Sequence, residues 1–163
     1  MKSNELIRII SYEPHHKNAF RDLNQAWIEK YFKMEETDHN SLDNPKEYIL
    51  DKGGFILVAV IKKEVVGVCA LIKMDHDKYD YELAKMAVSP KHFKKGIAWQ
   101  ISQAVINLAK INAAKYLYLE SNTKLEPAIK LYRKLGFIEV SDEPSPYERA
   151  NIQMELKLKP EIQ

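Results

Sequence analysis

Hydrophobic residues recur along this chain with two periods, roughly every second residue in some segments and every third or fourth in others. The isoleucine-rich stretch 6–12 predicts a first strand, which Pro14 ends. The next apolar residues are spaced three and four apart, and this predicts one face of an amphipathic helix. These residues are Phe20, Leu23, Trp27 and Tyr31.

A second, short helix is predicted by the residues at its start. Asn44-Pro45 followed by Glu47 combines a cap residue, a first-turn proline and a capping-box acid. The helix then continues through Leu50, and the glycine pair that follows ends it.

Three strands and a long helix are predicted next. Two continuous apolar runs, 55–61 and 65–72, are joined by a short polar link and predict two antiparallel strands of a buried sheet. A further strand covers 79–88 and is closed by a serine and a proline. The helical period of apolar residues over 97–111 then predicts a helix of about four turns.

The last third of the chain alternates strands with one more helix. The segment 116–120 predicts a strand, and Pro127 begins a helix that Gly136 ends as a C-terminal cap. The final strands are 137–140 and 151–158. The order β-α-α-β-β-β-α-β-α-β-β predicts an α/β or α+β fold, with helices that cover a sheet.

The composition is typical of one soluble globular domain, which we expect to span residues 1–163. The formal net charge is only +2, which argues against a nucleic-acid-binding protein. No apolar run reaches the ~18 residues of a membrane span, and the N-terminus lacks a signal-peptide core, so we expect no membrane association and a cytoplasmic location. Cys69 is the only cysteine and the histidines share no metal-ligand spacing, so no disulfide and no metal site is predicted.

One segment contains a candidate ligand site, the sequence VSPKHFKKGIA at 88–98. Gly96 allows the backbone to approach a ligand, and the first turn of the following helix presents unpaired N–H groups suited to a phosphate. Lys94 and Lys95 add positive charge. The segment has neither Walker-loop spacing nor G-x-G-x-x-G, which argues against nucleotide hydrolysis and hydride transfer. A plain strand-to-helix turn with solvated lysines is the alternative.

Three segments in the same order resemble the GNAT superfamily of N-acetyltransferases. FKKGIA at 93–98 resembles its acyl-CoA pyrophosphate loop, in which Phe93 replaces the usual Gln or Arg. YELAKMAV at 81–88 is similar to the central strand of the family, and AIKLYRKLGF at 128–137 is similar to its late helix. The resemblance covers nearly the whole chain and implies a GNAT-like fold. That fold is a mixed, mostly antiparallel sheet of about seven strands with helices on both faces.

The resemblance implies that acetyl-CoA is the co-substrate and that its pantetheine arm lies between the fourth and fifth strands. Backbone groups of Met86 and Val88 would bond the arm, and the Val88 N–H would polarise the thioester carbonyl. Lys134 would meet a cofactor phosphate or remain solvated. The predicted cofactor-binding residues are Met86, Ala87, Val88, Lys94, Lys95, Gly96, Ile97, Ala98, Asn122 and Lys134.

The resemblance also implies two catalytic residues. Glu82 occupies the strand position of a general base, where partial desolvation would raise the pKa of its carboxyl group. The alternative is a carboxylate at the rim or one paired with Lys85. Tyr132 matches the tyrosine four residues before the glycine cap, which donates a proton to the departing thiolate, and the alternative for Tyr132 is core packing.

The implied acceptor is a primary amine of a small molecule or peptide. It would attack the thioester directly in a ternary complex, because no Ser/His/Asp or Cys/His group suggests a covalent acyl-enzyme. Near the acceptor, Arg149 would pair with an acceptor carboxylate. An acidic segment would attract a cationic amine or form a solvated loop. Its acids are Glu35, Glu36, Asp38 and Asp43.

Two other hypotheses stay open at this stage. The replacement at Phe93 is compatible with a non-catalytic acyl-CoA binding or sensing domain. A structural or protein-interaction domain without a nucleotide ligand is the second alternative. Members of the resembling family are often dimers. The resemblance is therefore compatible with a homodimer, and the sequence itself leaves monomer and dimer open.

Overall fold

The computed structural model describes residues 6–141 and 145–159. Within these residues one sheet has seven strands in the order β1-β2-β3-β4-β5-β7-β6. The strands are β1 (Ile7–Ser11), β2 (Phe55–Ile61), β3 (Glu64–Lys73), β4 (Tyr81–Val88), β5 (Tyr116–Ser121), β6 (Ile138–Val140) and β7 (Ile152–Lys157). Only β4 and β5 pair in parallel, so the mixed, mostly antiparallel sheet is confirmed. Residues 1–5, on which the expectation of no export signal depends, lie outside the described residues.

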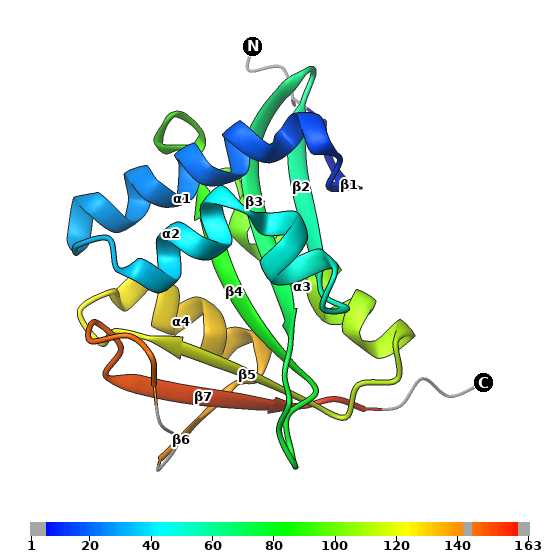
Figure 1. Ribbon diagram of the computed structural model, residues 1–163, viewed down its shortest axis with the longest axis vertical. Helices are drawn as coiled ribbons and strands as arrows, with labels where there is room; N and C mark the ends of the chain where they lie inside the picture. Colours follow the sequence, from blue (N-terminus) through cyan, green and yellow to red (C-terminus); the bar gives the residue numbers. More distant parts are fainter. Residues whose placement is uncertain (1–5, 142–144, 160–163) are drawn as a thin grey trace.

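Four α-helices of the described residues cover both faces of the sheet, and Figure 1 shows α1 and α2 crossing the face nearer the viewer. The opposite face is covered by α3 and α4, whose buried residues share one core. The helices are α1 (Lys17–Tyr31), α2 (Glu36–Asp43), α3 (Ile97–Ile111) and α4 (Glu126–Leu135), with shorter turns η1 (Pro14–His16), η2 (Lys46–Leu50) and η3 (Pro90–His92). None of the helices in the described part of the chain is long and apolar enough to cross a membrane.

The acidic segment is a helix, so its interpretation as a solvated loop is wrong. Glu35 and Asp38 form a capping box at the start of α2, in which the Glu35 N–H donates to Asp38 Oδ2 at 2.9 Å. Asp38, Ser41 and Leu42 are its buried residues, three and four positions apart. Two of these three residues are polar, which is why the hydrophobic pattern does not reveal the helix.

The predicted helix start at Asn44-Pro45 is also wrong in detail. Asn44 is the C-cap of α2, and its N–H donates to the carbonyl of Asn40 at 3.1 Å. The residues after Pro45 form only the five-residue π-helix η2, and Pro45 makes no side-chain capping bond.

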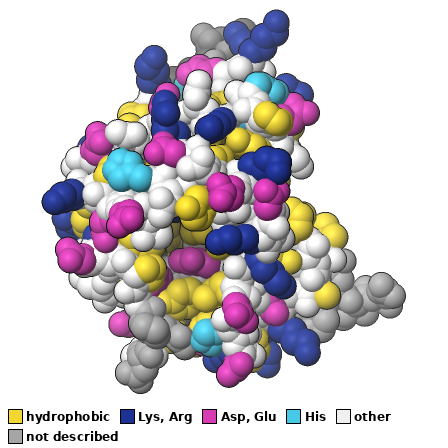
Figure 2. All heavy atoms as spheres, viewed as in Figure 1, with side chains coloured by type: hydrophobic (Ala, Val, Ile, Leu, Met, Phe, Trp, Pro, Cys, Tyr) yellow, Lys and Arg dark blue, Asp and Glu magenta, His cyan; other side chains and the backbone are white. Residues whose placement is uncertain are grey.

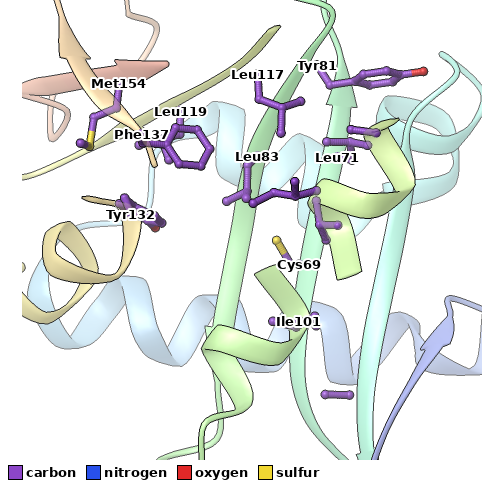
Figure 3. Close-up of a cluster of buried hydrophobic side chains, with 14 of the residues drawn as sticks. Cys69, Leu71, Tyr81, Leu83, Ile101, Leu117, Leu119, Tyr132, Phe137 and Met154 are labelled. Carbon is purple, nitrogen blue, oxygen red and sulfur yellow. The ribbon is translucent and has the colours of Figure 1, made fainter. Parts of the chain in front are cut away.

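The sheet separates two hydrophobic cores. The larger core combines strand residues such as Leu83 and Leu117 with residues of α3 and with Tyr132 of α4 (Figure 3). The smaller core packs α1 and α2 against the other face. Side chains alternate along a strand. Because Tyr81 and Leu83 belong to the larger core, Glu82 between them points to the face covered by α1 and α2.

The parallel pairing of β4 and β5 is very short. Only two residue pairs join the strands, Tyr81 with Leu117 and Glu82 with Tyr118. Beyond Glu82 the two strands diverge, as Figure 1 shows. β4 remains paired with β3 on its other side, through a register shift at Lys85, where φ is +54°.

A close contact between Gly67 of β3 and Ile97 fixes the start of α3 against the sheet. A Cβ placed on Gly67 would lie 2.8 Å from Cγ2 of Ile97, a side chain that is only 2% exposed. Gly67 also pairs with Val88, the last residue of β4. The absence of a side chain at Gly67 therefore sets the distance between α3 and the end of β4.

Gly67→Val is expected to destabilise the fold by about 1–3 kcal/mol, because the added side chain overpacks the contact with Ile97. Gly67→Ala should have a smaller effect in the same direction. Urea unfolding monitored by circular dichroism measures both changes. A valine variant as stable as the parent protein would contradict this packing argument.

Candidate active site

A cleft of ≈ 810 Å³ opens where β4 and β5 diverge. Figure 2 shows a hollow at this place, with hydrophobic side chains and an acidic group at its floor. Its walls come from α1, from β4 and the segment that follows it, from β5, from α4 and from the residues before β7. The cleft therefore reaches both faces of the sheet between the diverging strands.

The segment after β4 brings the start of α3 to the wall of this cleft. Gly96 is the N-cap residue with φ +78°, a left-handed conformation that favours glycine, and no side chain caps the helix. A Cβ placed on Gly96 would meet no atom within 4 Å, so this side of the turn is open. Helix geometry leaves the first N–H groups of α3 without carbonyl partners, so an anion would find donors here.

Only some of the predicted cofactor-binding residues of this segment line the cleft. Lys94, Gly96, Ile97 and Ala98 line the cleft, whereas Lys95 is not among the lining residues. Phe93, which replaces the polar residue of the resembling loop, is 46% exposed at the cleft wall.

Two side chains near the segment show different environments. His92 lines the cleft, and its Nδ1 is buried without a hydrogen-bond partner among the described residues. Sequence reasoning gave His92 no role, and this orphaned nitrogen is the signal that singles it out. Lys134 does not line the cleft, and its Nζ lies 4.6 Å from the ring centroid of Trp99, which does.

The end of β4 turns main-chain groups towards the cleft. The Ser89 N–H donates to the carbonyl of Val66 on β3 at 2.8 Å. Neighbouring residues of an antiparallel strand direct their N–H and C=O groups to opposite sides, so those of Val88 point away from β3. β5 offers no partner there, because its pairing with β4 ends at Glu82. Met86 and Ala87 also line the cleft.

Glu82 lies at the closed end of the cleft, next to the last parallel pair. Burial, with a smaller effect from Glu120, raises the pKa of its carboxyl group to about 7, although Lys85 acts in the opposite direction. No ion pair joins Glu82 to a cation within residues 6–141 and 145–159. The side chain is therefore suited to exchanging a proton near neutral pH.

Tyr132 reaches the cleft from the opposite face of the sheet. It is 8% exposed and packs edge-on against Phe137 at a centroid distance of 6.1 Å (Figure 3). Burial, with a smaller effect from Cys69, raises the pKa of its phenol well above the usual value, so the group stays protonated at neutral pH. No acceptor for its hydroxyl lies in the described part of the chain. Core packing and an open donor thus coexist in this residue.

Asn122 lines the cleft but uses its side-chain amide within the protein. Its Nδ2 donates to the carbonyl of Arg149 at 2.8 Å, and its Oδ1 accepts from the Lys124 N–H at 3.0 Å. The residue therefore ties the turn after β5 to the segment before β7. Its predicted contact with a cofactor stays a prediction.

A buried ionic cluster forms one wall of the cleft. Asp38 of α2 is fully buried, with Lys85 Nζ at 2.8 Å from Oδ1. Arg149 binds the same carboxylate with both terminal nitrogens, at 2.6 and 2.7 Å, and Glu35 at 3.1 Å. The hydroxyl of Tyr147 accepts from Lys85 at 3.0 Å. These contacts hold the pKa of Asp38 at about 2 against the effect of burial.

Two sequence-based expectations are affected by this cluster. Arg149, expected to meet an acceptor carboxylate, has carboxylates of the protein itself on its guanidinium. Lys85 pairs with Asp38 rather than with Glu82.

Comparison with known proteins agrees with this geometry. The sequence model of the acetyltransferase (GNAT) family matches residues 19–137. The chain belongs to the GNAT family. It is 34% identical over 96 residues to N-acetylaspartate synthetase of Danio rerio, a match that covers 58% of this chain and 33% of that protein. It is 28% identical over 116 residues to N-acetyltransferase 8B of Rattus norvegicus, which covers 69% of this chain and 51% of that protein. The chain thus spans about a third to a half of the length of these curated relatives.

Solved structures of GNAT proteins share the fold. An acetyltransferase of the family from Staphylococcus aureus Mu50 superposes with a TM-score of 0.84 at 24% identity, covering 94% of this chain and 100% of that chain. An aminoglycoside 6'-N-acetyltransferase complexed with coenzyme A gives a TM-score of 0.73 at 17% identity, over 96% and 99% of the two chains. The seven-stranded sheet with its diverging central strands is therefore the GNAT fold.

Glu82→Gln is expected to change how stability depends on pH. The folded state holds the Glu82 proton up to about pH 7 whereas the unfolded chain releases it near 4.5, so Glu82 lowers stability as pH rises between these values. The loss is at most about 3 kcal/mol. The free energy of unfolding of Glu82→Gln, relative to that of the parent protein, should therefore increase as pH rises from 4.5 to 8.

Urea unfolding across this pH range measures the effect. Glu36→Gln removes a carboxylate from an exposed position of α2 and is the matched control. If the curves of parent and Glu82→Gln run parallel, Glu82 has no raised pKa.

Proposed function

We propose that this protein transfers an acetyl group from acetyl-CoA to a primary amine of a small molecule or peptide, within a ternary complex. The observation that carries the proposal is the open glycine turn at the start of α3, placed beside the unpaired edge of β4. Membership in the GNAT acetyltransferase family supports the reaction class. The chain covers only part of its curated relatives, so activity and acceptor are both part of the proposal.

The residues of the cleft fit coenzyme A. Gly96 leaves space for a diphosphate at the positive end of α3, and Lys94 lies at the same wall. The main-chain groups of Val88 are turned to the cleft, where an extended amide-containing arm would pair with them. The orphaned Nδ1 of His92 offers a further polar contact. Two structural neighbours, the aminoglycoside acetyltransferase and an acetyltransferase from Bacillus subtilis, were solved with coenzyme A.

Acetyl-CoA supplies the acetyl thioester when it is bound. The Val88 N–H, facing the cleft, serves as a donor to the carbonyl oxygen that gains charge in the reaction. Glu82 accepts a proton from the acceptor ammonium, directly or through water, because a carboxyl group with a pKa of about 7 is partly deprotonated at neutral pH. Tyr132 keeps its proton and offers it from the opposite face, where the sulfur would leave.

The division of the cleft between the two faces supports this assignment of roles. Glu82 points to the face of α1 and α2, whereas Tyr132 belongs to the core under α3 and α4. A base and an acid that approach the diverging strands from opposite sides match a transfer in which amine and thiol lie on opposite sides of the acyl group. We therefore assign the α1 and α2 side to the acceptor, and call it the acceptor side.

A non-catalytic acyl-CoA binding domain is the second candidate, because the exposed Phe93 stands where related loops carry Gln or Arg. Both candidates predict binding of acetyl-CoA. Only the enzyme predicts that free CoA thiol appears when an amine is added.

Acetyl-CoA is expected to bind the protein, and Gly96→Val should weaken the binding about ten- to a hundredfold. The valine strains a left-handed position and fills the open side of the turn, which removes main-chain hydrogen bonds to the diphosphate. Isothermal titration calorimetry measures the dissociation constants.

Gly53→Val is the matched control for backbone strain. Gly53 also has a left-handed φ of +94°, but it is an exposed residue that does not line the cleft. Its substitution should leave the affinity near that of the parent protein. Equal weakening by both variants, or no heat with the parent protein, would contradict the proposed cofactor site.

Tyr132→Phe is expected to lower kcat by about 10²-fold, because it removes the proton donor and keeps the ring in the core. A panel of primary amines assayed for thiol release provides the measurement. Tyr116→Phe, on β5 outside the cleft, is the matched control and should keep kcat.

In the parent protein kcat/KM should rise with pH through about 7, and in Glu82→Gln this rise should be lost.

Unchanged turnover in Tyr132→Phe would remove the role assigned to its hydroxyl. Binding of acetyl-CoA without thiol release from any amine would favour the non-catalytic domain.

A further inference from the structure

The acceptor side has a wall of two cations and one aromatic ring, which we call the cationic wall: Lys85, Tyr147 and Arg149. All three line the cleft, yet Lys85 is only 5% exposed and Arg149 only 17%. The Tyr147 ring has Lys85 Nζ at 4.9 Å and Arg149 Cζ at 4.4 Å from its centroid. The two positive charges therefore lie close together on the acceptor side of the cleft.

Asp38 neutralises these charges by forming ion pairs with both cations. One oxygen of its carboxylate binds Lys85 at 2.8 Å and the guanidinium at 2.7 Å, and the other binds the guanidinium at 2.6 Å. Glu35 adds a second carboxylate to the guanidinium at 3.1 Å. Asp38 of α2 and Glu35, its N-cap residue, thus balance the two cations of the cationic wall, charge for charge.

The remaining acids of the acceptor side have no such balance. Glu82 and Glu120 line the cleft, and neither forms an ion pair within the described ranges. Glu120 accepts a neutral hydrogen bond from the Tyr118 hydroxyl at 3.1 Å.

Lys124 and Lys30 also line the cleft. Lys124 Nζ donates to the carbonyl of Tyr31 at 3.0 Å and lies over the ring of Phe32 at 4.1 Å. Lys30 Nζ lies over the rings of Tyr31 and Phe93, at 5.3 and 5.9 Å from their centroids.

We infer, on the basis of the proposed function, that Asp38 determines acceptor choice: by holding Lys85 and Arg149 in ion pairs, it reserves the site for amines that carry no carboxylate. An ammonium group is attracted by the unbalanced acids at the floor of the cleft. A carboxylate on the acceptor finds Lys85 and Arg149 already held in ion pairs and is repelled by the same acids. Asp38 is a specificity-determining residue that acts through Lys85 and Arg149 and does not touch the reacting atoms.

The test compares matched acceptors, L-phenylalanine, L-lysine and L-aspartate, with their α-carboxamide forms, in which a neutral amide replaces the α-carboxylate. The parent protein should show a higher kcat/KM for each amide than for its acid. In Asp38→Asn this preference should fall by about tenfold, because the two cations lose their shared partner and attract a carboxylate. A loss of folding alone would lower both rates and leave their ratio unchanged.

Two further variants keep the test decisive if Asp38→Asn folds poorly, as the loss of a buried partner can cause. Glu35→Gln weakens the same balance at a more exposed position and should shift the ratio in the same direction by a smaller factor. Glu36→Gln, an exposed neighbour on α2 that does not line the cleft, should leave the ratio unchanged.

The outcomes separate this inference from the function on which it rests. If amines are acetylated but neither Asp38→Asn nor Glu35→Gln changes the ratio of amide to acid kcat/KM, the inference is overturned and the proposed function stands. A parent protein that prefers the acids to the amides overturns it as well. If thiol is released from no acceptor, the proposed function fails, and the inference fails with it.

Discussion

The molecule depends on an interruption of main-chain pairing between two central strands of its sheet. β4 and β5 share only two residue pairs before they diverge. Buried main-chain groups nearly always find hydrogen-bond partners, so an edge within a domain that faces a cleft is suited to a ligand with amides of its own. The register shift at Lys85 belongs to the same feature, because it bends β4 while the pairing with β3 continues. The cleft, its two mouths and the orientation of Val88 all follow from this divergence.

The cluster around Asp38 holds one mouth of that cleft in shape. Moving charged groups out of water is costly, and a carboxylate with no exposed surface persists only with several partners. Asp38 has two cationic partners, one on β4 and one before β7. The cluster thereby joins the segment before β7 to α2 and β4, which also share the smaller hydrophobic core. The same contacts that hold the wall in place also cancel its charge, so structure and electrostatics are inseparable there.

Features encoded locally could be predicted from the sequence, and features built from distant polar residues could not. The order of the strands along the chain and the glycine turn at Gly96 follow from short apolar runs and from one residue type, and both agree with the structure. The helix α2 escapes prediction because Asp38 and Ser41 occupy buried positions that a hydrophobic pattern assigns to apolar residues. The contacts of Asp38 with Lys85 and Arg149 span 47 and 111 residues of sequence, so no spacing rule reveals them.

The candidate residues show the same division. The raised pKa of Glu82 follows from a carboxyl group on a central strand, and this much was predictable. That Glu82 and Tyr132 approach from opposite faces depends on the alternation of side chains between two cores, which only the folded sheet fixes. Arg149 illustrates the reverse case: its residue type suggested a partner outside the protein, and the fold supplies partners from within.

The placement of helices on the two faces of the sheet makes the chain modular. One mouth of the cleft is built from α1 and the residues before β7, and the other from the starts of α3 and α4. These parts come from separate stretches of sequence that meet at the central strands and through a few contacts such as that of Lys124 with Tyr31. Substitutions on α1 or before β7 can therefore reshape the acceptor side while the glycine turn before α3 keeps its sequence, so the same scaffold can serve different acceptors.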